Sequence, residues 1–139
     1  MGYRSPYVYT LAIKLGSTAP ADSLTYYGGV HLIAWSDLNR NLVRLYIPKT
    51  GRIVGVQLHL KCAAAGTAEN VIFALRLNDT TDYPIATISM NSTSNLVQNL
   101  NLNISVVSGD YVELKMTTPA WVTNPTTCYT GGHILIECE

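Results

Sequence analysis

Hydrophobic and polar residues alternate along most of the chain, which is the pattern of β-strands that bury one face. In the clearest run, residues 100–106 read Leu-Asn-Leu-Asn-Ile-Ser-Val, and residues 54–61 alternate in a similar way. No segment of about ten or more residues shows the period of an amphipathic helix. The alternation predicts eight or nine strands, at about residues 5–15, 26–35, 42–47, 52–61, 71–78, 84–90, 96–106, 111–117 and 132–138.

Residues that favour tight turns separate these runs. Gly, Pro, Asn or Asp occur in residues 48–51, 78–82 and 108–110, each between two predicted strands. Many short strands without helices predict an antiparallel two-sheet sandwich, and about eight strands is the number in a jelly roll. We therefore expect an all-β, jelly-roll-like sandwich over residues 26–139. Residues 1–25 are expected to form an N-terminal strand or arm, suited to docking on a partner.

The charge of the chain limits its partners. Nine Lys and Arg balance nine Asp and Glu in 139 residues, and only 13% of residues are charged, against about 25% in ordinary soluble domains. Proteins that bind nucleic acid usually carry a basic surplus, so we expect no nucleic-acid partner. A neutral, weakly charged surface is poorly protected from association. This favours a homo-oligomer.

Membrane insertion is not expected. No apolar run approaches the roughly 20 residues that span a bilayer. The first residues, Met-Gly-Tyr-Arg-Ser-Pro, lack the apolar segment of a secretory signal peptide. We therefore expect a protein that is made and assembled in a cytoplasm.

The three cysteines are Cys62, Cys128 and Cys138. Their spacing matches no zinc motif, and an odd count without an export signal argues against a disulfide framework. We expect buried, reduced thiols. The alternative is a single bridge, either Cys62–Cys128 or Cys128–Cys138.

No catalytic or metal-binding motif is apparent. The histidines His31, His59 and His133 lie outside any hydrolase or zinc signature. Asp79 and Asp82 share a turn that loosely resembles a calcium loop, but the regular D-x-D-x-D-G order is missing. We expect no enzymatic activity, no metal and no cofactor.

The aromatic residues are the strongest candidates for contact. Nine tyrosines and two tryptophans accompany a single phenylalanine, and Tyr and Trp are enriched at interfaces. One group near the N-terminus is predicted to form an interface or docking surface: Tyr3, Tyr7, Tyr9, Tyr26 and Tyr27. A second group is predicted to stack against a ligand: Trp35, Trp121 and Tyr129.

Three segments resemble a known class of module. They read Gly-Arg-Ile-Val-Gly-Val-Gln-Leu at 51–58, Phe-Ala-Leu-Arg-Leu-Asn at 73–78, and Val-Val-Ser-Gly-Asp-Tyr-Val-Glu-Leu-Lys at 106–115. In this order they resemble the jelly-roll modules of phage and other viral fibre, spike and capsid-decoration proteins. Those modules are similar in shape to trimeric C1q/TNF-like heads. The resemblance implies a trimer on a virion surface, assembled in the host cytoplasm, with no catalytic residues to carry over.

Two functions are left open by the sequence. The first is a non-enzymatic structural or attachment protein of a virion, a symmetric oligomer in which weak contacts add into avidity. Its partners would be other virion proteins, and loops around residues 78–83 and 119–129 would face outward. The alternative is a carbohydrate-binding β-sandwich module that stacks a host-surface glycan on Trp35, Trp121 or Tyr129.

Overall fold

The computed structural model describes residues 7–30 and 42–138. This part of the chain is built from strands, which confirms the all-β class predicted from the alternation. The strands are β1 (Tyr7–Thr18), β2 (Thr25–Gly28), β3 (Leu45–Tyr46), β4 (Gly51–Lys61), β5 (Asn70–Leu77), β6 (Thr81–Ser89), β7 (Ser94–Asn99), β8 (Ile104–Val106), β9 (Tyr111–Thr117) and β10 (Cys128–Cys138). None of the described residues forms a helix long and apolar enough to cross a membrane.

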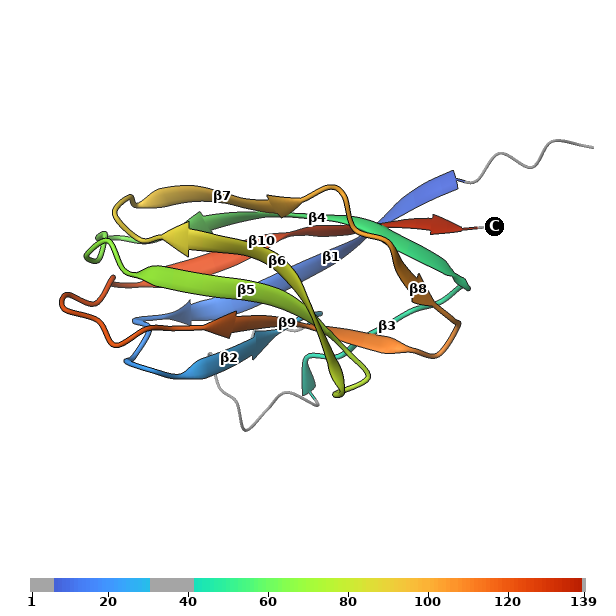
Figure 1. The fold of residues 1–139 in the computed structure, drawn as a ribbon, viewed down its shortest axis with the longest axis horizontal. Coiled ribbons are helices and arrows are strands. Elements are labelled where there is room, and N and C mark those ends of the chain that lie inside the picture. The colour runs from blue at the N-terminus through green and yellow to red at the C-terminus, as the bar shows by residue number, and fades with distance from the viewer. Residues whose placement is uncertain (1–6, 31–41, 139) are drawn as a thin grey trace, which may run out of the picture.

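The strands form two antiparallel sheets (Figure 1). Sheet A has the order β1-β10-β4-β7, and sheet B has the order β2-β9-β5-β6. β8 pairs with the first residues of β4, and β7 pairs with the later residues of β4. β7 and β8 therefore occupy a single strand position at the edge of sheet A. β2 and β3 share β9 in the same way. Each sheet thus has four strand positions, and the eight positions form the predicted jelly-roll-like sandwich.

The core lies between the two sheets and is filled by alternate residues of each strand. β9 contributes Val112, Leu114 and Met116, and β10 contributes Ile134 and Ile136, all 1% exposed or less. Their polar or small neighbours point to the outer faces, as the period of two requires. The hydrophobic pattern therefore fixes which face of each strand is available for function.

One edge of the sandwich is closed where β1 meets β2. Lys14 N–H donates to the Gly29 carbonyl over 3.0 Å, and Gly29 N–H donates to the Lys14 carbonyl over 2.8 Å. A side chain at Gly28 would collide with the Lys14 carbonyl and with Leu15 of β1, so only glycine allows this approach. β1 also pairs with β10 along its length. The described part of the expected N-terminal arm thus belongs to the sandwich.

A disulfide joins Cys62, after β4, to Cys128, at the start of β10. This corrects the expectation of three reduced thiols and selects one of the two alternative bridges. The register pairs Lys61 with Tyr129, so the next residues, Cys62 and Cys128, lie opposite each other although 66 positions separate them. Cys138 is free and buried. Spacing along the chain could not reveal this, because it depends on which strands are neighbours.

We predict that replacing both Cys62 and Cys128 by Ala lowers the free energy of unfolding by about 3–4 kcal/mol, because the bridge closes a long loop in the unfolded chain. Chemical denaturation of the oxidised protein and of the variant measures this difference. Cys138→Ala is the control, since it removes a buried thiol without opening a loop and should cost about 1 kcal/mol. Equal losses in the two variants would contradict the prediction.

Candidate functional site

The candidate site lies on the outer face of sheet B, along β9. Because Val112, Leu114 and Met116 point into the core, the residues between them point outward. One of these outward residues, Glu113, is nevertheless 0% exposed. A fully buried carboxyl on the outer face of a sheet must be covered, and charged groups are rarely buried without a partner.

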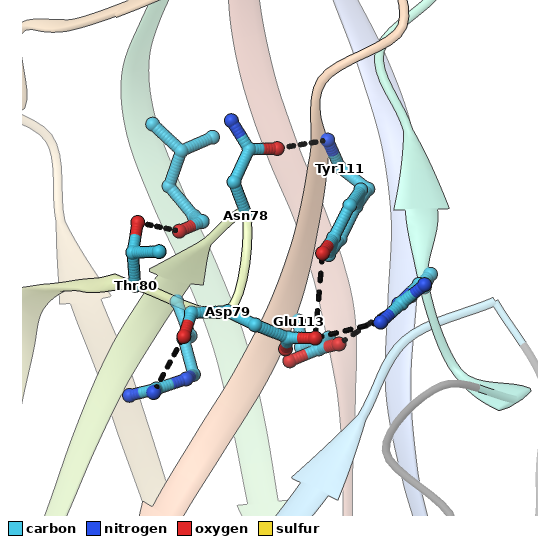
Figure 2. A network of polar contacts seen from close by, with 8 residues as sticks. Asn78, Asp79, Thr80, Tyr111 and Glu113 are labelled. Atoms are coloured by element: carbon cyan, nitrogen blue, oxygen red, sulfur yellow. Dashed lines mark hydrogen bonds and ion pairs between the residues drawn. The ribbon is translucent and has the colours of Figure 1, made fainter.

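The hairpin turn between β5 and β6 forms part of this cover. Asn78 and Asp79 have φ angles of 52° and 56°, and Thr80 N–H donates to the Leu77 carbonyl over 3.0 Å. These features define a type I′ turn, in which Asn and Asp tolerate positive φ. The Asn78 side chain accepts a hydrogen bond from Tyr111 N–H over 3.0 Å, which fixes the turn to β9 (Figure 2). Asp79 is thereby held beside Glu113.

Arg44, just before β3, joins the two carboxyl groups. Its Nη2 lies 2.6 Å from Oδ2 of Asp79, and its Nε lies 3.5 Å from Oε1 of Glu113. The guanidinium also stacks on Tyr111, 4.1 Å from the ring centroid, in a favourable cation–π contact. Tyr111 O–H donates to Asp79 over 3.3 Å. One cation is therefore shared between two acidic side chains.

Glu113 is the unusual member of this cluster. Burial, followed by the proximity of Asp79, raises the pKa of Glu113 to about 7, and Arg44 only partly opposes this shift. Neither oxygen of Glu113 accepts a hydrogen bond from an N–H or O–H group of the described residues. The carboxyl can therefore bind a proton near neutral pH. A pKa near 7 also suits general acid–base catalysis, but a fully covered side chain cannot touch a substrate.

A second ion network lies next to the first on the same face. Asp82 pairs with Arg76 over 2.8 Å and with Lys115 over 2.6 Å. Although burial opposes it, the hydrogen bonds from Lys115 and Arg76 lower the pKa of Asp82. Arg76 also donates to the Asp79 carbonyl over 2.8 Å. Asp79 and Asp82, the acidic residues of the turn that loosely resembles a calcium loop, thus both pair with basic side chains. No group of three or more His, Cys, Asp or Glu that could hold a metal occurs among the described residues.

The tyrosines predicted to dock on a partner are mostly used inside the chain. Tyr26 is 6% and Tyr27 is 7% exposed, and the Tyr26 hydroxyl accepts a hydrogen bond from Ala21 N–H. Tyr9 is half-buried against the core. The backbone of Tyr7 lies in β1, and Tyr3 lies outside the described residues. Tyr26 packs in the core cluster, whereas Tyr27 lies on the outer face of sheet B opposite Lys115, and neither ring is exposed in this structure.

Two of the three predicted stacking residues, Trp121 and Tyr129, lie in the described part of the chain, and their surroundings differ. Trp121 is 7% exposed and donates its indole N–H to the Ala21 carbonyl over 3.3 Å, so it offers no open face to a sugar. Tyr129 is 50% exposed and points from β10 to the outer face of sheet A. Trp35 lies outside the described residues. Tyr46, which sequence reasoning missed, is 59% exposed and packs edge-on against Tyr111.

Of the histidines, His59 and His133 lie on the outer face of sheet A, and His59 hydrogen-bonds Ser94 over 2.8 Å. His31 lies outside the described residues. A cavity of about 270 Å³ opens at one end of the same sheet, lined in part by Arg52, Val107 and Glu137. Arg52 and Glu137 form an ion pair of 2.8 Å, so the cavity wall carries no unbalanced charge from them.

Comparison of the sequence with protein-family models and with curated proteins finds no match.

We predict that Arg44→Met lowers the free energy of unfolding by about 2–3 kcal/mol at pH 8, because it leaves Asp79 and Glu113 without their shared cation. The loss should be smaller at pH 5, where Glu113 carries a proton. Thermal or urea unfolding at both pH values measures this. Arg52→Met is the matched control, since it breaks the half-exposed pair with Glu137 and should cost less than about 1 kcal/mol. Similar losses in both variants would count against the site.

We also predict that stability falls as pH rises through neutrality. The pKa of Glu113 is raised in the folded protein, from 4.5 to about 7, so the folded state holds a proton that the unfolded chain has already lost. This stabilisation is complete below pH 4.5 and is lost as pH rises through 7. The wild type should lose about 2–3 kcal/mol between about pH 5 and pH 8. Glu113→Gln should remove this part of the pH dependence, and an unchanged profile would refute the assignment.

Proposed function

We propose that this protein is a non-enzymatic contact module that assembles into a symmetric homo-oligomer through the outer face of sheet A. We further propose that it serves as a structural or attachment protein of a virion, as capsid decoration, spike or fibre head. The observation that carries the proposal is the difference between the two outer faces of the sandwich. One face is closed by ion pairs, whereas the other is broad and weakly charged.

The middle of the outer face of sheet A carries no Asp, Glu, Lys or Arg among the described residues. Across the sheet, the register aligns one row of side chains, Ala12, His133, Gln57 and Gln98. The next row aligns Thr10, Leu135 and Gly55. The charged residues lie toward the ends of the face: the Arg52–Glu137 pair at one end, and Lys14 and Lys61 at the other.

Large apolar side chains are exposed on this same face. Val8 is 53%, Leu96 is 56% and Tyr129 is 50% exposed. Leu100 and Leu135 lie over Gly55, where the small residue lets them approach the sheet. Apolar surface with few charges is typical of the centre of a protein interface. A second copy of the chain fits this surface best, because the uncharged middle of the face can meet its own copy without repulsion, while Lys14 and Lys61 lie toward one end.

The outer face of sheet B has the opposite character. Six of the chain's charged residues gather there, and each pairs within the chain: Arg44, Arg76, Asp79, Asp82, Glu113 and Lys115. Among the described residues, the outer face of sheet A has fewer charged residues, Lys14, Arg52, Lys61 and Glu137, and of these only Arg52 and Glu137 form an ion pair with each other. Sheet B therefore suits the solvent side of an assembly.

Two observations support a virion as the setting. The jelly-roll arrangement agrees with the resemblance of residues 51–58, 73–78 and 106–115 to viral modules, although a fold by itself does not define a function. The buried Cys62–Cys128 disulfide suits a protein that works outside a reducing cytoplasm, and virion surfaces are among the places where disulfides persist. A trimer is the favoured state, because the viral modules that this chain resembles are similar in shape to trimeric C1q/TNF-like heads.

We predict that Leu96→Lys weakens self-association by at least about tenfold in the dissociation constant, because it places a charge in the apolar face of sheet A. Sedimentation equilibrium at micromolar concentration measures the change. Ile72→Lys is the matched control: Ile72 is 50% exposed on the outer face of sheet B and should leave association unchanged. A wild type that sediments only as the 15.2 kDa chain would overturn the homo-oligomer, and dissociation by Ile72→Lys alone would place the interface on the other sheet.

A further inference from the structure

We propose that Glu113 is a proton-binding site, and that its proton acts as a latch that holds Arg44 and the β5–β6 turn against β9. The latch consists of Arg44, Asp79 and Glu113. It is closed when Glu113 is protonated and loosened when the proton is lost. This proposal concerns the outer face of sheet B and is independent of the proposed self-association through sheet A.

The geometry leaves Glu113 without enough donors in its ionised form. Nη2 of Arg44 is engaged by Asp79 at 2.6 Å, and the contact of Nε with Glu113 is longer, at 3.5 Å. A buried carboxylate usually needs strong hydrogen bonds to offset the loss of water. A protonated Glu113 instead becomes a donor and can share its proton with the Asp79 carboxylate, as close carboxyl pairs do in other proteins.

The charges around Glu113 do not replace the missing donor. Arg76, its cross-strand neighbour on β5, binds Asp82 of β6 and the Asp79 carbonyl. Lys115, two residues along β9, also binds Asp82. Tyr111 on β9 donates its hydroxyl to Asp79, and Tyr27 on β2 lies opposite Lys115 in the strand register, not opposite Glu113. Loss of the proton therefore leaves the buried charge of Glu113 and the partly buried charge of Asp79 against one shared Arg44.

Besides the latch, β3 and the turn are joined to β9 by a small number of hydrogen bonds. β3 has only two residues in its ladder with β9. The turn is fixed to β9 mainly through Asn78, whose N–H donates to the Tyr111 carbonyl over 2.9 Å and whose side chain accepts from Tyr111 N–H. Repulsion between Asp79 and Glu113 acts directly beside these bonds (Figure 2). We therefore expect local opening at the turn rather than unfolding of the sandwich.

Amide hydrogen exchange tests the latch in the intact protein. The protection factors of the Asn78 and Tyr111 amides, corrected for the intrinsic effect of pH, should fall by about tenfold between about pH 6 and pH 8. Amides in the centre of β10 should show no such fall. In parallel, carboxyl carbon NMR of the wild type should show Glu113 titrating near pH 7.

Two variants separate the latch from general effects of charge. Glu113→Gln is neutral at every pH and can donate to Asp79, so its protection factors should stay constant from pH 6 to pH 8. Glu137→Gln, which removes the exposed partner of Arg52, should keep the wild-type fall. An ordinary titration of Glu113 near 4.5, or a wild-type fall that persists in Glu113→Gln, would overturn the proposal. The wild-type titration decides the matter even if Glu113→Gln does not fold.

Discussion

The register of β9 is the constraint on which the rest of sheet B depends. Burial of Val112, Leu114 and Met116 against the opposite sheet leaves only one register, because a slip of one residue would turn all three to the outer face. That register places Glu113 on the outer face, opposite Arg76 of β5. The apolar core thus decides where an acidic side chain must lie, and the outer surface must then accommodate it.

Glu113 is accommodated by other charged side chains that gather around it on the outer face of sheet B. The type I′ turn carries Asp79 to Glu113, and Arg44 neutralises part of the resulting negative charge. Ion pairs gather on the outer face of sheet B, whereas the middle of the outer face of sheet A has no charged side chain among the described residues. The proposed solvent side and the proposed self-association side are therefore two consequences of one distribution. Neither face can be understood from its own residues alone.

Sequence reasoning reached the fold but not the site, and the difference has a physical cause. The alternation of hydrophobic and polar residues depends on local burial, so it predicts strands such as β4, β5 and β9. Glu113 occupies the polar phase of such a strand, and alternation predicts it to be exposed. Its burial depends on Arg44 and on a turn more than 30 residues away, which only the pairing of strands brings close. The same reason hid the Cys62–Cys128 bridge and the burial of Trp121.

The two sheets differ in how firmly they are held, and this bears on how the proposed assembly would respond to pH. In sheet A, the Cys62–Cys128 disulfide links the end of β4 to β10, and these are the two central strands of the proposed self-association face. The latch lies on the outer face of sheet B, separated from that interface by the full core. A change in the protonation of Glu113 can therefore alter the β5–β6 turn and Arg44 without disturbing contacts between copies. A particle built in this way would keep its assembly while the face turned to solvent changes with pH.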